Sequence, residues 1–353
     1  MIRAASLRGP RRLELDPVGL PPPRPDDVLV RVVACGVCAT NLHDWAHPDR
    51  AMRGSELPGA HGHEVSGVVA SVGEAVEGVA PGDRVCLDPG LACACGVCEP
   101  CLAGRPRSCR NRSTLPVWGF ADAIVVPARG VVQIPAGLDL EVACLAEPLA
   151  SAVHGIRHGW SAATDGRIEG LRVAVVGAGA MGLCAVLAAR RLGAAEVIVV
   201  ARHEHQARVA AALGADRVLD DDAGTGSVLR RLRPHLVVEA AGGNGSAFET
   251  ACAAVEDGGE VVVLGLPDGH AALDVPRLVL RNVHAFFAAA YGVRDGRSDF
   301  SIALAILAET AAAAQLITHR FPLDDVGDAF RAAAWRTGGS LRVVVSGSYL
   351  PNV

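Results

Sequence analysis

The pattern of hydrophobic and polar positions changes near residue 150. Before that point, short Val-rich runs bounded by Gly, Pro or Asp predict β-strands. The expected strands are residues 28–34, 64–72, 84–87 and 123–126. This part of the chain is therefore expected to form a compact, irregular β domain.

After residue 150, apolar strand-like runs alternate with alanine-rich stretches of helical length. Strands are expected at 173–176, 196–200, 217–219, 236–239, 260–264 and 283–287, with helices at 180–192, 205–213, 227–232 and 246–255. Strands joined by helices predict an α/β fold with a doubly wound parallel sheet. The tail shows another pattern, with helices expected at 300–314 and 326–335 and a last strand at 341–345 that rejoins the first domain.

Length and charge narrow the function classes. A chain of 353 residues has room for two domains with separate cores. Its net charge of -5 comes with no concentrated basic stripe, so a small-molecule partner is expected and neither nucleic acid nor a membrane surface.

The first 12 residues lack an apolar signal region, which predicts a cytoplasmic protein. The uncharged run 173–189 nears membrane-spanning length, but its three glycines favour strand, turn and helix.

Four of the eleven cysteines form the strongest motif. Cys95, Cys98, Cys101 and Cys109 have the spacing C-x2-C-x2-C-x7-C in a loop that contains Gly and Pro. Four thiolates can close a tetrahedral zinc site with no open position, which makes the predicted site structural. Cys93 lies just outside this pattern and is interpreted as a bystander.

A dispersed set of residues predicts a second metal site. Cys38, His63 and Glu147 are of the types that bind zinc, and Glu64 follows His63 directly. Three protein ligands of mixed type leave a fourth zinc position open for a substrate, as a Lewis-acid site requires.

A glycine-rich turn predicts dinucleotide binding. Gly177, Gly179, Ala180, Met181 and Gly182 lie directly after an expected strand and at the start of an expected helix. The glycines permit a tight turn and the close approach of a pyrophosphate to the helix N-terminus. The strand before the turn and the five after it favour a cofactor site over a ligand-free glycine turn.

The end of the second strand of this domain bears on the choice of cofactor. NAD-binding domains normally carry an acidic residue there, about 20 residues beyond the glycines, which binds the ribose 2'-hydroxyl. Here Ala201 and Arg202 occupy that place, and a guanidinium can bind a 2'-phosphate. NADP(H) is therefore predicted over NAD(H), with nearby Glu204 as the feature that opposes this choice.

These motifs together resemble the zinc-containing medium-chain alcohol and polyol dehydrogenases, and they do so over nearly the whole chain. The segments that carry the resemblance are 35–43, 62–64, the four-cysteine lobe, 147–149, the glycine turn and the closing stretch 321–343. The resemblance implies a GroES-like catalytic domain at 1–150 with a zinc lobe at 93–110, a Rossmann domain at 151–290, and a segment 291–353 that returns to the catalytic domain. It also implies a homodimer or homotetramer.

Residue roles follow from the same resemblance. Cys38, His63 and Glu147 match the catalytic zinc ligands, and Glu64 matches a carboxylate on or next to the metal. Glu147 or Glu64 is then the third resting ligand. The Glu147-Pro148-Leu149 form is similar to that of polyol and threonine dehydrogenases.

A proton relay is implied as well. Thr40 matches the hydroxyl residue that receives the substrate proton, and His43 matches the outer histidine, with His47 as its substitute. The implied reaction is zinc-dependent hydride transfer between an alcohol, secondary or polyol-like, and NAD(P)+. The alternatives are a zinc-free quinone or enoyl reductase and a non-catalytic zinc and nucleotide-binding protein.

Two departures from the family pattern concern the same region. Asn41 stands where many relatives carry Asp, and residues 57–61 differ from the usual apolar approach to Gly62. These loops are expected to line the substrate cleft. His61 is then either a pocket residue or a solvent-facing histidine.

Overall fold

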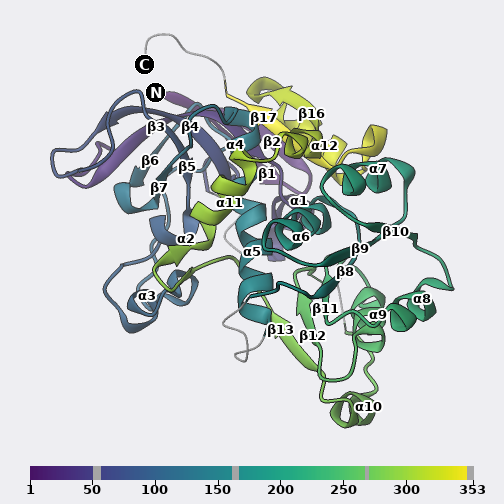
Figure 1. The fold of residues 1–353 in the computed structure, drawn as a ribbon. Helices are drawn as coiled ribbons and strands as arrows, with labels where there is room; N and C mark the ends of the chain where they lie inside the picture. The colour runs from purple at the N-terminus through teal and green to yellow at the C-terminus, as the bar shows by residue number, and fades with distance from the viewer. Residues whose placement is uncertain (51–56, 161–166, 267–269, 348–353) are drawn as a thin grey trace. The chain divides into compact units, whose positions relative to one another are not determined.

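The chain forms two compact units in a computed structural model that describes residues 1–50, 57–160, 167–266 and 270–347 (Figure 1). The first unit contains Met1–Glu147, Leu307–Glu309 and Ile317–Val353, and the second contains Pro148–Ile306 and Thr310–Leu316. Both ends of the sequence thus belong to the first unit. Across the described residues, no helix has the length and apolarity to cross a membrane.

A seven-stranded sheet forms the centre of the first unit. Its path runs through β16 (Ile317–Pro322), β17 (Arg342–Ser346), β3 (Asp27–Gly36), β4 (Glu64–Val72), β5 (Arg84–Leu87) and β7 (Val131–Gln133), while β6 (Ala123–Pro127) pairs with β3. A hairpin of β1 (Ile2–Gly9) and β2 (Arg12–Val18) joins it through a bridge between Ala4 and Ala121.

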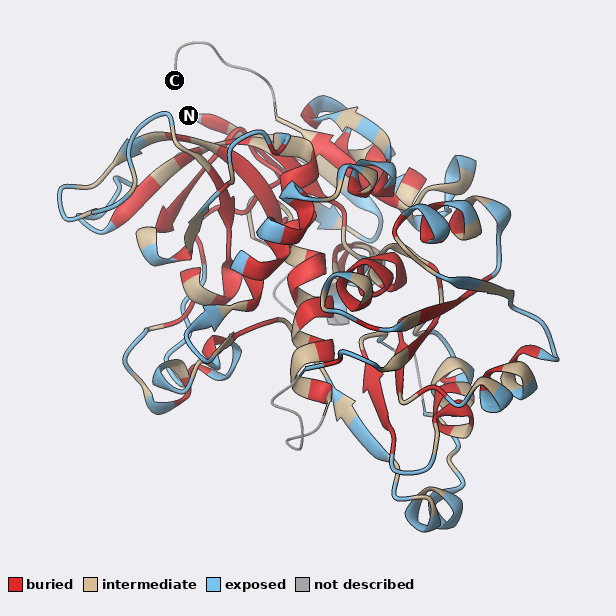
Figure 2. Cartoon of the chain, in the orientation of Figure 1, coloured by how far each residue is buried: buried red, intermediate tan, exposed pale blue. Residues whose placement is uncertain are grey.

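Short helices complete the first unit, namely α1 (Ala39–Ala46), α2 (Pro89–Ala92), α3 (Glu99–Leu102), α4 (Leu140–Ala143) and α12 (Val326–Ala334). Alternating valines of β3, including Val28, Val30 and Val32, are buried in one core with Phe120 and Phe330 (Figure 2). Because Phe330 lies on α12, the C-terminal segment is part of this core.

The second unit is built on a six-stranded parallel sheet in the order β10-β9-β8-β11-β12-β13. The strands are β8 (Arg172–Val176), β9 (Glu196–Ala201), β10 (Arg217–Asp220), β11 (Leu236–Glu239), β12 (Glu260–Val263) and β13 (His284–Phe287). This order is that of a Rossmann fold, in which β9 and β10 are added on one side of β8, and β11, β12 and β13 on the other. The predicted doubly wound α/β class is confirmed.

Helices connect these strands. They are α5 (Ala146–Gly159), α6 (Ala180–Arg191), α7 (Glu204–Ala212), α8 (Thr225–Leu232), α9 (Ser246–Ala254), α10 (Val275–Leu280) and α11 (Asp299–Ala308), with a hairpin of β14 (Val293–Arg294) and β15 (Arg297–Ser298) before α11. α6 contacts α7, and α8 contacts α9, as expected for two helical layers. The helix expected at 300–314 is shorter, since α11 ends at Ala308 and a 3₁₀ helix follows at Ala311–Leu316.

A buried carboxylate ties α5 to the start of α11. Asp299 is fully buried, and its Oδ1 accepts a hydrogen bond of 2.5 Å from Arg157. Its Oδ2 lies 2.8 Å from Nδ1 of His154 and accepts from the Gly292 amide at 3.0 Å. Burial opposes ionisation of Asp299, but the hydrogen bonds from His154 and His158 outweigh it and hold its pKa well below the ordinary value.

Candidate metal centres and cofactor site

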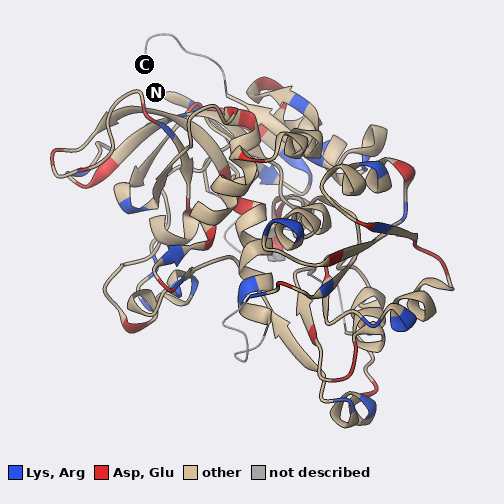
Figure 3. Ribbon diagram, viewed as in Figure 1, with Lys and Arg blue, Asp and Glu red and all other residues tan. Residues whose placement is uncertain are grey.

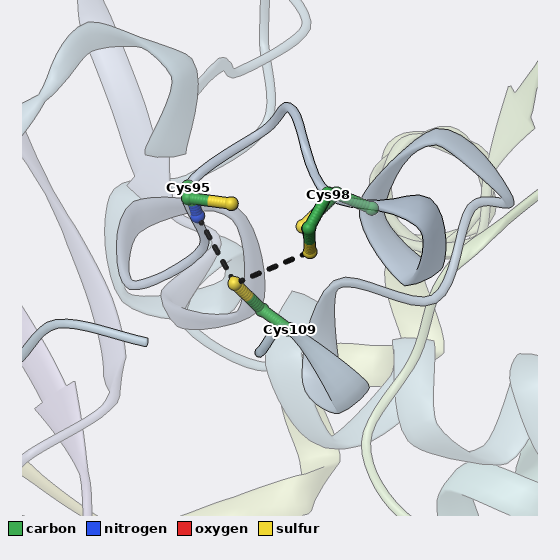
Figure 4. Close-up of side chains that lie close together, drawn as sticks. Cys95, Cys98 and Cys109 are labelled. Carbon is green, nitrogen blue, oxygen red and sulfur yellow. Dashed lines mark hydrogen bonds between the residues drawn. The ribbon is translucent and has the colours of Figure 1, made fainter. Parts of the chain in front are cut away.

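The four predicted lobe cysteines converge. The Sγ atoms of Cys95, Cys98, Cys101 and Cys109 all lie within 4.8 Å of one another. Figure 4 shows three of them, Cys95, Cys98 and Cys109, with their side chains close together. The backbone amides of Cys95 and Asn111 each donate to Sγ of Cys109 at 3.3 Å. Cys93 is buried outside this group. Four thiols with amide donors aimed at sulfur fit a structural zinc ion.

Backbone amides favour the thiolate form of two lobe cysteines, whereas burial raises the pKa of Cys101 to about 12. Hydrogen bonds from the amides of Val97 and Cys98 lower the pKa of Cys95 to about 6. Amides of Arg110 and Cys101 lower the pKa of Cys98 in the same way. Since only a thiolate binds zinc tightly, these amides prepare two of the four ligands.

The second metal group lies where β3, α1 and β4 meet. Cys38 is the N-cap residue of α1, directly after β3, and Glu64 is the first residue of β4, preceded by His63. Antiparallel pairing of β3 with β4 places Gly36 opposite Glu64, which brings the two segments together. Ligand atoms of Cys38, His63 and Glu64 lie within 4.8 Å of one another.

His63 is oriented for metal binding. Its Nδ1 lies 2.9 Å from the carbonyl oxygen of His61, so this nitrogen is the donor and Nε2 is the atom that would bind a metal. The hydroxyl of Thr40 lies 3.5 Å from that Nε2. The structure therefore places the predicted relay hydroxyl beside the metal group.

Glu64 combines a buried charge with an unsatisfied oxygen. Its side chain is fully buried, and Oε1 accepts a 2.8 Å hydrogen bond from Arg342, whereas the buried Oε2 has no partner. Burial and the Glu64 carboxylate raise the pKa of the Cys38 thiol. A divalent cation would satisfy Oε2 and favour the Cys38 thiolate, so the donor set fits zinc.

Two other predicted residues of this site, Glu147 and His43, are not members of the group that Cys38, His63 and Glu64 form. Glu147 lies on α5, outside the group that Cys38, His63 and Glu64 form. His43 lies on α1 with Nδ1 3.3 Å from Oδ1 of Asp44, and its side chain is 36% exposed. Partial exposure suits a residue that exchanges protons with solvent.

His61 is buried, 5% exposed, and its ring lies against Trp118 with centroids 4.1 Å apart. The solvent-facing alternative for His61 is therefore wrong.

The glycine turn has the form expected of a dinucleotide site. Gly177 follows β8 with a φ of +102°, and Gly179 is the N-cap residue of α6. A Cβ atom on Gly182 would lie 1.8 Å from the carbonyl oxygen of Gly177, whereas one on Gly179 would meet open space. Gly177 and Gly182 thus permit the turn, and Gly179 leaves the helix N-terminus open to a phosphate.

Arg202 directly follows β9 and already has a partner. Its Nε and one terminal nitrogen donate to Oδ2 of Asp221 at 3.0 and 2.8 Å. Parallel pairing of β9 with β10 matches Ala201 to Asp220, which explains why the next residues meet. The segment that ends β10 and follows it is acidic, as Figure 3 shows by its red colour.

The structure adds residues that the sequence did not single out. A cavity of about 230 Å³ lies at the carboxyl ends of β11, β12 and β13, lined among others by Glu239, Leu264, Leu266 and Phe287. Oε1 of Glu239 accepts hydrogen bonds from the amides of residues 241 and 242, both at 2.8 Å. Ligands of Rossmann folds bind at this edge of the sheet. The expected carboxyl ends of the strands were therefore the feature of the sequence that could have located this cavity.

A third group of metal-ligand type occurs in the second unit. It contains His154, His158 and Asp299. Arg157 already neutralises the same carboxylate, and a cation beside that guanidinium would be repelled. The group is therefore interpreted as the link between α5 and α11.

The fold and these sites define a zinc-dependent oxidoreductase that uses a nicotinamide dinucleotide. Residues 24–136 match the alcohol dehydrogenase GroES-like domain, and residues 180–309 match the zinc-binding dehydrogenase domain. L-threonine 3-dehydrogenase of Anaeromyxobacter sp. is 32% identical over 332 residues, which cover 90% of this chain and 91% of that enzyme. The chain belongs to the zinc-binding medium-chain alcohol dehydrogenase family.

Solved structures agree with this assignment. A zinc-binding dehydrogenase from Sinorhizobium meliloti, solved with NADP bound, superposes with a TM-score of 0.83 at 28% identity, covering 98% of this chain and 99% of that one. 2R,3R-butanediol dehydrogenase from Bacillus subtilis has a TM-score of 0.82 at 22% identity, covering 99% and 100%. The second likeness concerns the fold alone.

Proposed function

We propose that this enzyme oxidises a secondary alcohol that carries a neighbouring polar group, and reduces the corresponding ketone in reverse. The observation that carries the proposal is the convergence of Cys38, His63 and Glu64 within 4.8 Å in a chain of this family. A zinc ion held by these residues would supply a Lewis acid that lowers the pKa of a substrate hydroxyl. A zinc-free reductase would not need this donor set.

Residues of this chain handle the proton. Thr40 accepts the substrate proton on its hydroxyl oxygen and passes its own hydroxyl proton toward His43, since this hydroxyl lies 3.5 Å from His63 Nε2 and hence beside the metal group. His43, partly exposed on the same helix, delivers the proton to solvent. Glu147 is proposed as the third resting ligand because it matches the family's ligand position. Glu64 is proposed as a carboxylate that exchanges with it, because its buried Oε2 has no partner and lies in the metal group.

We infer the substrate class from the enzymes that this chain resembles. They include L-threonine 3-dehydrogenases and, by fold, a 2R,3R-butanediol dehydrogenase. The oxidised carbon in both named substrates bears a secondary hydroxyl next to a carbon that carries another polar group. We therefore expect activity with vicinal diols, polyols or β-hydroxy amino acids, and little activity with primary alcohols such as ethanol.

NADP(H) is proposed as the preferred cofactor. Arg202 stands where a carboxylate would repel the 2'-phosphate, and its side chain is 69% exposed. Burial, followed by the neighbouring His203 and Arg208, lowers the pKa of His205, so the permanent positive charge on α7 near its start is that of Arg208. A 28% identical relative was solved with NADP bound. Asp221 opposes the preference by neutralising Arg202.

We propose that the enzyme forms a homo-oligomer through the edge of the sheet in the second unit. β13 is the last strand in the sheet order, and Phe287 on it is 67% exposed. Val279 and Leu280 on α10 are 67% and 84% exposed. An apolar edge strand favours pairing with another chain. Light scattering should detect a dimer or tetramer, and a Phe287→Lys variant should shift it toward monomer.

The decisive experiment is a screen of purified enzyme against diols, polyols, hydroxy amino acids, simple alcohols and their ketones, with NAD+ or NADP+ and the reduced cofactors. The readout is nicotinamide absorbance. Turnover of a secondary vicinal alcohol that is lost in His63→Ala supports the proposal. Equal turnover by wild type and His63→Ala would contradict it.

A further inference from the structure

Glu239 is a buried carboxylate at the end of β11 that has no role in the steps described above. It is 2% exposed, and its Oε1 accepts hydrogen bonds of 2.8 Å from the backbone amides of Ala241 and Gly242. Among the described residues, both hydrogen-bond donors to this carboxylate are backbone amides, and neither is a guanidinium or an imidazole. The two amides bind the charge but do not cancel it, so its field extends into its surroundings.

The carboxylate lines the cavity of about 230 Å³ at the carboxyl ends of β11, β12 and β13. Most of the other lining residues are apolar, among them Leu264 and Phe287. A Cβ atom on Gly265, just after β12, would lie 2.6 Å from Oε2 of Glu239, so the lack of a side chain there leaves room for the carboxylate. A charge beside an apolar cavity is screened less than a charge in water, and it acts more strongly on a ligand nearby.

The order of the sheet indicates which half of a dinucleotide belongs near Glu239. The pyrophosphate belongs at the glycine turn between β8 and α6, and the adenosine ribose belongs at the end of β9. β9 is added on one side of β8, whereas β11 and β12 are added on the other. The strand ends beside Glu239 are thus left for the nicotinamide half of the cofactor.

We propose that Glu239 makes this enzyme bind the oxidised cofactor more tightly, relative to the reduced cofactor, than it otherwise would. Hydride transfer moves a hydrogen with its electron pair from the alcohol carbon to the nicotinamide ring, and the ring thereby loses its positive charge. A fixed negative charge attracts the oxidised ring and has little effect on the neutral reduced ring. The proposal rests on the hydride transfer of the proposed function, and it holds whichever alcohol is the substrate.

A role limited to the shape of the loop after β11 is the competing explanation, because Glu239 also holds two amides of that loop. Glu239→Gln separates the two roles. Its amide oxygen can accept the same two hydrogen bonds, but the side chain carries no charge. Glu239→Ala removes the acceptor as well, so any effect of the loop should appear in this variant with both forms of the cofactor.

A matched control is present on the neighbouring strand. Glu260 is 5% exposed and is the first residue of β12, where the register places it beside Leu236 at the amino end of β11. Glu239 lies at the other end of β11, about 10 Å further along the strand. Because cofactors bind at the carboxyl ends of the strands, Glu260→Gln should leave the preference between the oxidised and reduced forms unchanged.

The test measures the dissociation constants of the oxidised and reduced forms of NAD and of NADP for the zinc-loaded enzyme, by calorimetry and by the fluorescence of the reduced nicotinamide. In Glu239→Gln the oxidised form should bind about tenfold more weakly, while the reduced form binds as it does to the wild type. Glu260→Gln should keep the wild-type ratio of the two constants. An unchanged ratio in Glu239→Gln, whatever its melting temperature, would overturn the proposal.

Failure of the proposed function would give a different result. If the wild type bound neither form of either cofactor, the assignment of hydride transfer itself would be refuted. Binding of both forms in a ratio that is insensitive to Glu239→Gln would refute the role of Glu239 alone.

Discussion

Glu64 and Arg342 form a buried ion pair that joins the start of β4 to the start of β17. The guanidinium nitrogen lies 2.8 Å from Oε1, and the side chains are 0% and 6% exposed. Arg342 also donates to the carbonyl of Val37 at 3.0 Å, next to Cys38. A residue near the chain's end thus holds a carboxylate of the metal group.

Arg342→Met should lower the free energy of unfolding by about 3–5 kcal/mol, because Glu64 would remain as a buried, unpaired charge. The double variant Glu64→Gln with Arg342→Met should recover part of that loss. Denaturant titration measures both. Arg331→Ala is the control, since Arg331 and Asp328 form an exposed pair on α12, and its effect should stay within about 1 kcal/mol. Similar small losses for both arginines would rule out an energetic role for the buried pair.

Elemental analysis should find two zinc ions per chain. Cys101→Ser should remove one of them and lower thermal stability, while cobalt(II) bound at the Cys38 site keeps its spectrum. Cys38→Ser should remove the other and abolish turnover with cofactor binding intact. The two sites use separate ligand sets, so their metal losses should be additive. A fully loaded wild type with one zinc ion would show that one of the two sites has been misassigned.

Thr40→Ala should slow alcohol oxidation by about 10²–10⁴-fold while both zinc ions remain, because the substrate proton loses its acceptor. Thr40→Ser keeps the hydroxyl and should restore most of the rate. Steady-state rates across pH, with zinc content measured alongside, give the comparison. An alanine variant as fast as the serine variant at every pH would remove Thr40 from the relay.

Arg202→Ala should weaken NADP+ binding by about 10- to 100-fold and leave NAD+ binding nearly unchanged, since it removes a charge-assisted contact to the 2'-phosphate. Asp221→Asn should strengthen NADP+ binding severalfold by releasing Arg202 from an exposed ion pair. Calorimetry gives both affinities. Arg217 and Glu196 pair at the opposite ends of the same two strands, so Arg217→Ala is the control. Tighter binding of NAD+ than of NADP+ by the wild type would reject the preference.

Asp299 should make the enzyme sensitive to acid. Its pKa is lowered in the folded state because hydrogen bonds from His154 and His158 outweigh the effect of burial. A lowered pKa stabilises the folded state above the ordinary carboxyl pKa of about 4, and that stabilisation is lost as the pH falls toward the folded value. The gap in unfolding free energy between wild type and Asp299→Asn should therefore shrink from pH 5 to pH 3. Asp328→Asn, at an exposed site, should show no such gap.

Local sequence patterns predicted many of the strands and helices of the second unit. The strand at 217–219 lies within β10, the strand at 236–239 coincides with β11, and the glycine turn lies between β8 and α6. Parallel strands buried on both faces form apolar runs of this kind, which is why they can be recognised without the fold. In the first unit, β4 spans the expected residues 64–72.

The features that the sequence did not predict depend on contacts between residues that are far apart in the chain. β1 and β2 were not expected, because charged residues such as Arg3 and Arg8 interrupt their hydrophobic pattern. No local signal pairs Glu64 with Arg342, which are 278 residues apart in the sequence. The meeting of Arg202 with Asp221 also required the register of β9 against β10.

The pairing of β17 with β3 sets an order of events during translation. The sheet of the first unit receives its last strands from residues 317–346, after the ribosome has synthesised the entire second unit. Domains fold as their residues emerge, so the parallel sheet forms while β3, already able to pair with β4 and β6, still lacks β17. The four-cysteine loop spans only 15 residues and can capture zinc early. Glu64 acquires its guanidinium partner only after the second unit has been synthesised, so the ion pair beside the metal group forms later than the parallel sheet.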